Sequence, residues 1–329
     1  MRMADVARIA GVTPTTVSRA MRNPGALSPA TLERVRAAIR QTGFVPNLAA
    51  RSLVSQRSQI IVALVPTIMN SVFSGAIETL SRELAAGDYT LLLGETGFDG
   101  AAEEELLRGF MGWRPAGLVL VGSAHTDGTR RILETASAAV VEIWNLPERP
   151  FDMAVGLDNR AAARAMTASL IEWGFRRIAF MNLHYPGNDR SVDRRDGWVD
   201  GLHSHGLEPL PELEARVPFG MEQAGLALMR LMQIRPRPDA LFCASDTLAV
   251  GALMAATRAG IRVPEDLAIA GFGDVELAST VVPSLTTVHV SRARIGRESA
   301  RLLLDRLEGR AEGPATVDCG FRIVRRESA

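Results

Sequence analysis

The chain has 329 residues, 47% hydrophobic and 22% charged, a length that predicts two or three folded units. Two cysteines, Cys243 and Cys319, are too few for a disulfide framework, and no apolar run reaches about 18 residues, so a transmembrane helix is excluded and a cytoplasmic protein is expected. Net charge is zero, yet residues 1–58 hold nine arginines against two acidic residues. A basic head on an acidic body indicates a nucleic-acid-binding module joined to another domain.

The beginning of the chain has the pattern of two short helices joined by a tight turn. Small and apolar residues recur at helical spacing over residues 4–10, and Gly11 then ends the helix because it can adopt the left-handed conformation. Thr13 is placed to cap a second helix over residues 14–22, with Pro14 at its first position. This pattern is typical of a helix-turn-helix, whose second helix enters the DNA major groove; the alternative is a helical hairpin that packs elsewhere.

A third helix and a short linker follow. Ser28-Pro29 predicts the helix start and Gly43 its end. Residues 47–53 are too few for a helix that is stable alone, because nucleation is costly, and we interpret them as a segment that folds when docked on DNA. We therefore divide the chain into a DNA-binding domain over 1–46, a hinge helix and linker over 47–58, and a body over 59–329.

From residue 60 the pattern changes to apolar runs that alternate with helical stretches, which is typical of parallel sheets covered on both faces. Strands are expected at 60–66, 89–93, 117–121, 140–144, 153–156, 177–181, 214–217, 240–244 and 267–270, and in a terminal strand pair. Helices are expected at 72–86, 103–112, 128–138, 160–174, 191–206, 222–234, 247–260 and 292–309. So many strands predict two α/β units with a ligand cleft between them, at the carboxyl ends of the strands.

No pattern in the chain indicates catalysis, a metal or a cofactor. The GFG at 271–273 lacks the third glycine of a dinucleotide loop, and there is no GxSxG elbow, Walker loop or HExxH pair. His203 and His205 flank Ser204 without the further ligands that a metal site needs. We expect no enzyme, no cofactor and no metal site.

Read in order, these stretches resemble the LacI family of bacterial transcriptional repressors over the whole chain. At the head the resemblance rests on DVARIAGVTPTTVSRAM (5–21) and SPATLERVRAAIRQTGFVPNLAARSL (28–53). In the body it rests on VGLDN (155–159), RRDGW (194–198), CASDTLAVGAL (243–253), RVPEDLAIAGFGD (262–274) and PSLTTV (283–288). Within the family, ETGFDGAAEEELL (95–107), VVEIWN (140–145) and VGLDN are most similar to the gluconate-type repressors.

The resemblance implies a small all-α helix-turn-helix domain and an α/β body of two parallel-sheet, Rossmann-like subdomains of the periplasmic-binding-protein type. It also implies a homodimer whose heads bind a near-palindromic operator in double-stranded DNA under the control of a small effector. The tail lacks the leucine heptads of tetrameric relatives, so a dimer is expected. The sequence does not determine whether the effector is an inducer or a corepressor.

The same resemblance assigns the DNA contacts to the second helix and the hinge. Pro14, Thr15 and Arg19 take the base-reading places, and arginine suits guanine because it can bond O6 and N7 together. Pro14 departs from the usual polar or aromatic residue. Leu53 would wedge into the minor groove, the alternative being a core leucine. The remaining DNA-binding positions are Thr13, Thr16 and Ser18 for phosphates, and Asn47, Ala50 and Arg51 in the hinge.

The implied effector site is spread over the body. Family effector positions fall at or near Phe73, Asp158, Arg194, Phe219, Ser245 and Asp246, and Gly273 stands where many relatives carry a sugar-binding aspartate. We add Glu142, which shares a predicted strand face with Trp144; for Trp144 core packing is an equal alternative.

Arg194 is the residue on which the effector class depends. Its guanidinium is suited to clamping a carboxylate or a hydroxyl pair, while a surface salt bridge with the neighbouring Asp193 or Asp196 is the alternative. A sugar acid such as gluconate suits this arginine and the subgroup resemblance. A neutral sugar or a phosphosugar remains the alternative effector.

Two other classes of protein share parts of this pattern. A sugar-binding transport receptor has the same body fold, but the basic head and the missing apolar signal core argue against it. A sugar-modifying enzyme on an α/β scaffold would need an acid–base constellation that the sequence lacks.

Overall fold

The computed structural model of the chain describes residues 2–22, 24–44, 58–69, 71–185 and 187–329. These residues form two compact units, Met1–Ser58 and Gln59–Ala329, and each is described by itself. The expected boundary between head and hinge at 46–47 lies outside the described residues. Within the described ranges, no helix combines the length and the apolar character needed to cross a bilayer.

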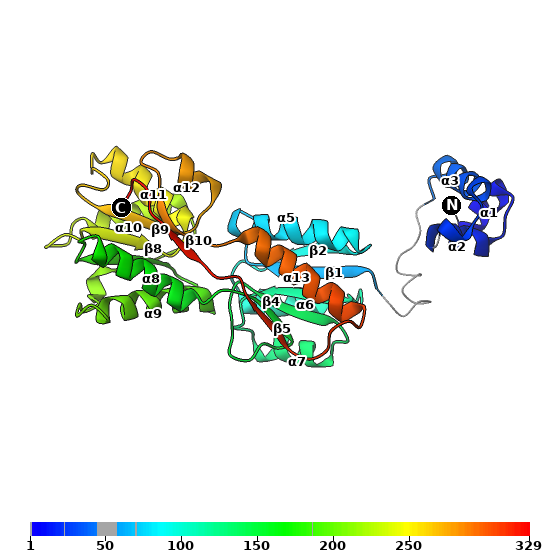
Figure 1. Cartoon of the computed structure of the whole chain (residues 1–329), viewed down its shortest axis with the longest axis horizontal. Helices are drawn as coiled ribbons and strands as arrows, with labels where there is room; N and C mark the ends of the chain where they lie inside the picture. Colours follow the sequence, from blue (N-terminus) through cyan, green and yellow to red (C-terminus); the bar gives the residue numbers. More distant parts are fainter. Residues whose placement is uncertain (1, 23, 45–57, 70, 186) are drawn as a thin grey trace. The chain divides into compact units, whose positions relative to one another are not determined.

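The first unit is a three-helix head. Its helices are α1 (Met3–Ala10), α2 (Pro14–Arg22) and α3 (Pro29–Thr42), with a 3₁₀ turn at Pro24–Ala26 (Figure 1). The backbone N–H of Arg2 donates to Asp5 Oδ2 at 2.9 Å, which closes the first turn of α1. Gly11 ends α1 with a φ of 61°, the left-handed conformation that its lack of a Cβ allows.

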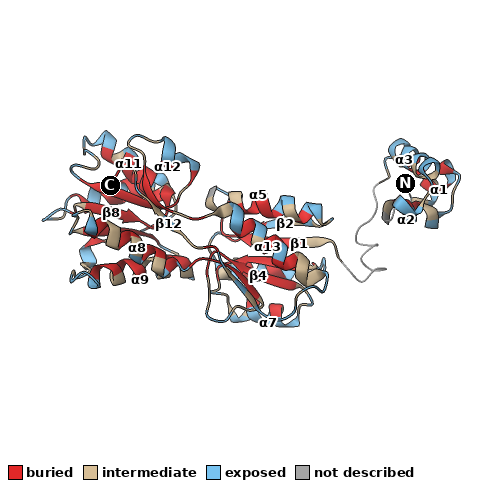
Figure 2. Ribbon diagram, in the orientation of Figure 1, coloured by how far each residue is buried: buried red, intermediate tan, exposed pale blue. Residues whose placement is uncertain are grey.

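The predicted caps of the next two helices are confirmed. Thr13 Oγ1 accepts the N–H of Thr16 at 3.2 Å at the start of α2, and Ser28 Oγ accepts the N–H of Thr31 at 3.3 Å at the start of α3. The three helices close over a core of small aliphatic side chains, coloured as buried in Figure 2. Its buried members are Val6, Ala7, Ala10, Val17, Ala20, Val35 and Ala38.

The body contains two six-stranded sheets. In the first, all strands are parallel, and the order is β11-β5-β4-β3-β1-β2. Its strands are β1 (Ile60–Val65), β2 (Thr90–Glu95), β3 (Gly117–Val121), β4 (Ala139–Ile143), β5 (Met153–Gly156) and β11 (Ala315–Asp318). Its helices are α5 (Ser71–Ala86), α6 (Gly100–Met111), α7 (Asp127–Thr135) and α13 (Arg292–Leu307). Apolar strands such as β1 and β3 are buried because helices cover both faces of the sheet.

The second sheet has the order β12-β10-β9-β8-β6-β7, parallel except for the edge strand β12. Its strands are β6 (Ile178–Leu183), β7 (Glu214–Val217), β8 (Ala240–Cys243), β9 (Ala268–Gly273), β10 (Thr286–His289) and β12 (Arg322–Val324). Its helices are α8 (Asn159–Glu172), α9 (Asp189–His203), α10 (Met221–Leu231), α11 (Asp246–Arg258) and the short α12 (Glu276–Thr280), with a 3₁₀ turn at Pro211–Leu213.

The terminal strand pair differs from the expectation. β11 and β12 do not pair with each other: β11 lies beside β5 in the first sheet, and β12 lies antiparallel to β10 in the second. The chain therefore passes between the sheets three times, at residues 157–158, 290–291 and 319–321 (Figure 1). Leu157, Val290 and Cys319 in these segments are buried, so the two subdomains share a continuous core at the crossings.

Candidate nucleic-acid interface and ligand cavity

The outward face of α2 is polar and open to an external partner. Thr15 and Arg19 are exposed and lie four residues apart, hence on one face of the helix, whereas Val17 between them is fully buried. Arg19 forms no hydrogen bond or ion pair within the described part of the chain. Its guanidinium donors are therefore available to bind an acceptor outside the head.

Threonine hydroxyls order the first turn of this helix. Thr13 Oγ1 lies 3.2 Å from Thr15 Oγ1 and 3.0 Å from Thr16 Oγ1, in addition to accepting the Thr16 N–H. The exposed Pro14 offers no N–H there, and Ser18 is half-buried one turn later. The capping hydroxyl is thus already occupied, and Thr15 and Arg19 are the side chains best placed to reach a partner.

The head presents several arginines that form no ion pair among the described residues. Arg40 pairs with Glu33 at 2.6 Å. No ion pair is found for the other exposed arginines of the described head residues, which are Arg2, Arg8, Arg19, Arg34 and Arg36. Uncompensated arginines on a small domain favour binding to a polyanion. The predicted hinge contacts Asn47, Ala50, Arg51 and Leu53 lie outside the described residues.

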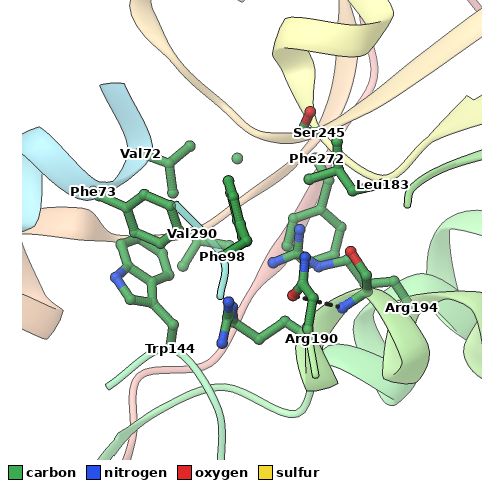
Figure 3. A pocket seen from close by; sticks show the side chains of 13 residues that line it. Val72, Phe73, Phe98, Trp144, Leu183, Arg190, Arg194, Ser245, Phe272 and Val290 are labelled. Carbon is green, nitrogen blue, oxygen red and sulfur yellow. Dashed lines mark hydrogen bonds between the residues drawn. The ribbon is translucent and has the colours of Figure 1, made fainter. Parts of the chain in front are cut away.

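A cavity lies between the two sheets of the body, at the carboxyl ends of their strands (Figure 3). Its cavity volume is about 30 Å³, so the side chains that line it leave little space between them. Its apolar walls come from both subdomains, and its polar groups come mainly from the first turns of α9. The lining residues are Val72, Phe73, Phe98, Trp144, Leu183, Asn188, Arg190, Ser191, Arg194, Ser245, Phe272, Gly273 and Val290. Apolar walls with a few convergent polar groups are typical of small-molecule sites.

Arg194 is a half-buried cation that lines the cavity. Its Nε donates to Asn159 Oδ1 at 2.8 Å, its Nη1 donates to the Ala244 carbonyl at 2.7 Å, and its Cζ lies 3.7 Å from the centre of the Phe272 ring. No carboxylate among the described residues lies within ion-pair distance of it. Burial, together with the charge of Arg190, lowers the pKa of Arg194 to about 9. No direct ion pair therefore compensates this charge, and Asp193, Asp189 and Asp246 attract it only from farther away.

The surface salt bridge that the sequence left open for Arg194 does not form. Asp193 accepts a hydrogen bond from Asn145 at 2.9 Å, and Asp196 pairs with Arg195 at 3.1 Å. The guanidinium of Arg194 instead points into the cavity region, against Phe272 (Figure 3).

Trp144 and Phe73 form the opposite wall. Their rings meet edge to face, with centroids 5.8 Å apart and an interplanar angle of 86°. Trp144 follows β4 directly and has a φ of 77°, a conformation that redirects the chain at the end of the strand. It is 1% exposed and belongs to the core as well as to the cavity wall, so both interpretations made from the sequence apply.

Asp189 at the start of α9 holds the two subdomains together beside the cavity. Its Oδ2 accepts the N–H of Ser123 at 2.7 Å, the hydroxyl of Ser123 at 2.9 Å and the Nδ2–H of Asn145 at 3.1 Å, and its Oδ1 pairs with Arg190 at 2.7 Å. Burial raises the pKa of Asp189, but the charge of Arg190 and the Ser123 N–H outweigh it, and the net shift is downward.

Comparison with known proteins identifies the family. The family model of lacI-family bacterial regulatory proteins matches residues 2–47, and that of the periplasmic binding protein-like domain matches residues 167–329. The HTH-type transcriptional regulator GntR of Escherichia coli (strain K12) is 33% identical over 98% of this chain and 96% of its own length. The chain belongs to the LacI family.

Other members are similar to the same degree. The transcriptional repressor CytR of Escherichia coli (strain K12) is also 33% identical, over 98% of this chain and 94% of its own length. A LacI-family transcriptional regulator from Silicibacter pomeroyi is 30% identical, with a TM-score of 0.89 over 100% of this chain and 99% of that one. The chain is therefore a DNA-binding transcriptional regulator with a helix-turn-helix head and an α/β body, and its relatives are not enzymes.

Four of the predicted effector residues of this LacI-family chain line the cavity: Phe73, Arg194, Ser245 and Gly273. Ser245 also caps α11 by accepting the N–H of Leu248 at 3.4 Å. A Cβ on Gly273 would lie 2.9 Å from Val72 Cγ2, so the absence of a side chain permits this close approach of α5 to β9. The following Asp274 does not take over the site, since it pairs with His289 and Arg326 at 2.7 Å each.

Two predicted acids serve other contacts instead of lining the cavity. Glu142 is 3% exposed; it accepts the N–H of Phe151 at 2.7 Å and lies 3.4 Å from His125 Nε2. It does not share a surface with Trp144, because the left-handed turn after β4 interrupts the alternation of the strand. Asp158 is exposed and caps α8 by accepting the N–H of Ala161 at 2.8 Å.

The remaining two predicted residues lie behind the cavity wall. Asp246 is fully buried and accepts the hydroxyl of Thr287 at 2.5 Å and the N–H of Val275 at 2.8 Å, and burial raises its pKa to about 6. Phe219 stands behind Phe98, with ring centroids 6.4 Å apart. Asp246 and Phe219 pack behind residues of the cavity wall, and neither lines the cavity.

Several cavity residues were not found from the sequence. Arg190 precedes Arg194 by four residues on α9, and this helical spacing was a usable signal. Phe98 lies in the connection between β2 and α6, and Val290 lies in a crossing segment, so no periodic pattern marked either. Asn188 and Ser191 form the N-terminal cap of α9, with the Ser191 N–H donating to Asn188 Oδ1 at 3.3 Å.

Proposed function

We propose that this regulator is a repressor that binds a near-palindromic operator as a homodimer and changes its operator affinity when an anionic sugar derivative enters the cavity. The first candidate effector is a sugar acid such as gluconate. Arg194 carries this choice: it lines the cavity, and no carboxylate of the described residues lies within ion-pair distance of it. A guanidinium without a direct ionic partner in a largely desolvated site favours an anionic ligand, whose charge would offset the cost of desolvation.

The DNA contacts that we propose remain those of the family pattern. Pro14, Thr15 and Arg19 would read bases, and Thr13, Thr16 and Ser18 would contact phosphates. The exposure of Thr15 and Arg19 on one face of α2 supports this proposal. The proposed hinge contacts are Asn47, Ala50, Arg51 and Leu53.

The proposed dimer is supported by an apolar face on the second subdomain. Side chains of α10 and α11 line a groove there, and apolar patches that remain exposed on a monomer mark interaction sites. Its large exposed members are Met221, Leu226, Met229 and Met254. A second copy of the chain would cover these side chains and bring two heads to the two halves of the operator.

Fluorescence polarisation with the intergenic DNA upstream of the protein's own gene tests the DNA half of the proposal. We expect specific binding that falls steeply with salt and that Arg19→Ala weakens by about tenfold or more, since a bidentate base contact is worth about 1–3 kcal/mol. Arg40→Ala is the matched control: it removes the same charge, but this arginine is engaged by Glu33. Equal losses for both variants, or binding no tighter than to random DNA, would contradict the proposal.

Calorimetric titration of the protein without DNA tests the effector class. Gluconate and its neutral counterpart glucitol differ in one group, carboxylate against hydroxymethyl. We expect gluconate to bind more tightly than glucitol, and Arg194→Met to abolish the difference. Equal binding of the two ligands by the wild-type protein would favour the neutral-sugar alternative and contradict the choice of an anionic effector.

A further inference from the structure

A second arginine of α9 faces the cavity together with Arg194. Arg190 lies four residues earlier, so the two side chains leave the helix on the same face, and both line the cavity (Figure 3). Like charges at this spacing repel each other. They also lie in the first turns of α9, where the partial positive charge of the helix N-terminus adds to theirs. Three positive contributions therefore converge on one site.

Arg190 has donors left for a ligand. Its Nη1 bonds to Asp189 Oδ1 at 2.7 Å, and no hydrogen bond from its Nε or Nη2 is found among the residues that the structure describes. Asp189 pairs with this arginine through Oδ1 alone, and Glu103 and Asp193 also attract its charge. Burial outweighs the attraction of Asp189, and the pKa of Arg190 is lowered. A guanidinium that is 8% exposed and keeps Nε and Nη2 without a partner among the described residues is suited to donate to a ligand oxygen.

The position of Arg190 is also specific to the closed cleft. It belongs to the second subdomain, yet it packs against Gly122 at the end of β3, where a Cβ would lie within contact distance of both Arg190 Nη1 and Asp189 Oδ1. Together with Phe98 and Asn188 it separates the main cavity from a neighbouring one of about 50 Å³. A ligand that bonds to Arg190 is therefore held at the junction of the two subdomains.

We propose that Arg190 is a specificity-determining residue of the effector site, which binds an anionic oxygen group of the ligand jointly with Arg194 and so selects charged over neutral sugar derivatives. This inference rests on the proposed function of the cavity as an effector site. The shared ligand chemistry is a carboxylate or a phosphate on a polyol.

The two arginines have different tasks in this arrangement. Arg194 is fixed by Asn159, by the Ala244 carbonyl and by the ring of Phe272, so it keeps one orientation in the absence of ligand. It retains Nη2 for a ligand oxygen, whether charged or neutral. Arg190 adds a second charge, and its loss reduces the preference for an anion while Arg194 still holds the ligand.

Calorimetric titration of the full-length protein tests the proposal with four probes: gluconate, glucose 6-phosphate, glucitol and inorganic phosphate. Arg190→Gln should weaken binding of the preferred anionic polyol by about ten- to hundredfold, the equivalent of one charge-assisted hydrogen bond, and should weaken binding of glucitol by a clearly smaller factor. Arg190→Lys, which keeps the charge, should retain most of the preference. Arg195→Gln is the matched control, since this neighbour on α9 is half exposed and pairs with Asp196 and Glu214.

The outcomes separate this inference from the proposed function. Gluconate binding marks the carboxylate as the recognised group, and glucose 6-phosphate binding marks the phosphate. Anion binding that Arg194→Gln abolishes and Arg190→Gln leaves intact would overturn the role of Arg190 alone. Wild-type protein that binds glucitol as tightly as gluconate, or that binds none of the four probes, would overturn the anionic effector and the role of Arg190 together. Inorganic phosphate that raises the unfolding midpoint of wild type but not of Arg190→Gln would support the role of Arg190 independently of the sugar.

Discussion

The charged residues near the cavity differ in whether other groups of the protein satisfy their charge and hydrogen bonds. Asp246 is fully buried, but Thr287 and the N–H of Val275 occupy both carboxylate oxygens, so it ties α11 to β10 and to the turn after β9. Arg194 is bonded only to neutral groups of the protein. We infer that Asp246 has a structural role and that Arg194 is available to bind a ligand.

His125 is a third buried charged group, enclosed by two acids of the first subdomain. Its Nδ1 lies 2.7 Å from Glu103 Oε1, its Nε2 lies 3.4 Å from Glu142 Oε1, and its side chain is 2% exposed. Burial lowers the pKa of His125, but the two carboxylates outweigh it and raise the value to about 9 from an ordinary 6.5. The protonated imidazole thereby neutralises charge that would otherwise be buried unpaired.

This cluster predicts a pH-dependent stability. Because the pKa of His125 is raised in the folded state, its contribution is fully present below 6.5 and is lost as the pH rises through about 9. His125→Gln should lower the free energy of unfolding at neutral pH by on the order of 3 kcal/mol. The difference from wild type, measured by urea unfolding, should shrink as the pH passes 9. His203→Gln, at an exposed histidine, should show no such trend; a constant difference for His125→Gln would refute the assignment.

The residue roles show what the sequence could not provide. Arg194 and Phe73 were found by resemblance, and the structure places both at the cavity. Asp158 was assigned by the same resemblance, and Glu142 because it shares a predicted strand face with Trp144. Backbone N–H groups occupy both carboxylates: that of Phe151 for Glu142, and that of Ala161 in the first turn of α8 for Asp158. Whether a carboxylate already accepts hydrogen bonds from the protein depends on its neighbours in the fold and on where helices begin. The identity of the charged residues in a sequence reveals neither.

At the scale of elements, the contact between the end of β3 and the start of α9 joins the two subdomains beside the cleft. Gly122 ends β3 with a φ of 88°, and the space that its missing side chain leaves is filled by the Asp189–Arg190 ion pair. The next residue, Ser123, donates two hydrogen bonds to Asp189 across the subdomain boundary. One short turn therefore determines how closely α9 approaches the first sheet.

Gly122→Ala should open this contact. The new Cβ would overlap the ion pair, and the left-handed backbone would be strained, so we expect a loss of about 1–3 kcal/mol in the free energy of unfolding and weaker binding of any cavity ligand. Gly109→Ala is the control, because it lies in α6 with no atom near its Cβ position, and it should leave both quantities unchanged or slightly raise stability. Equal behaviour of the two variants in denaturant unfolding and ligand titration would contradict the closure role.

The alternation of strands and helices was predictable from the sequence, whereas the end of the chain was not. A continuous apolar run such as β1 is recognisable as a buried strand, and a helix such as α13 is recognisable by apolar residues that recur at helical spacing. β10 was missed because its buried positions include Thr286 and Thr287, whose hydroxyls find partners in Asp246 and in the last residues of the chain. β11 and β12 were expected to form a pair, but their partners β5 and β10 lie far away in sequence, and local pattern carries no information on that pairing.

At the scale of the whole molecule, regulation requires that the body transmit the state of its cavity to another copy of the chain. Three crossing segments connect the subdomains, so any change in closure must bend residues 157–158, 290–291 and 319–321. The exposed apolar face of α10 and α11 belongs to the second subdomain alone. We therefore expect subdomain closure to move the first subdomains of a dimer relative to each other while the second subdomains stay in contact.

Leu226→Glu should disrupt this dimer. Leu226 is 54% exposed within the apolar groove, and burying an added carboxylate against a second copy would be costly. Sedimentation velocity should show a shift toward monomer, and operator affinity should fall because one head contacts one half-site. Val192→Glu provides the control, since Val192 is equally exposed, at 55%, but lies on α9 outside the groove. Retention of the wild-type dimer by Leu226→Glu would exclude this face as the interface.

The most direct test of the account is a titration of the operator complex with gluconate, for wild type and for Arg194→Met, followed by fluorescence polarisation. We predict that gluconate changes the operator dissociation constant of the wild-type protein, that glucitol does not, and that Arg194→Met binds the operator but no longer responds. The direction of the wild-type change identifies the effector as an inducer or a corepressor. An equal response of wild type and Arg194→Met would contradict the claim that an anion held by this cavity arginine controls DNA binding.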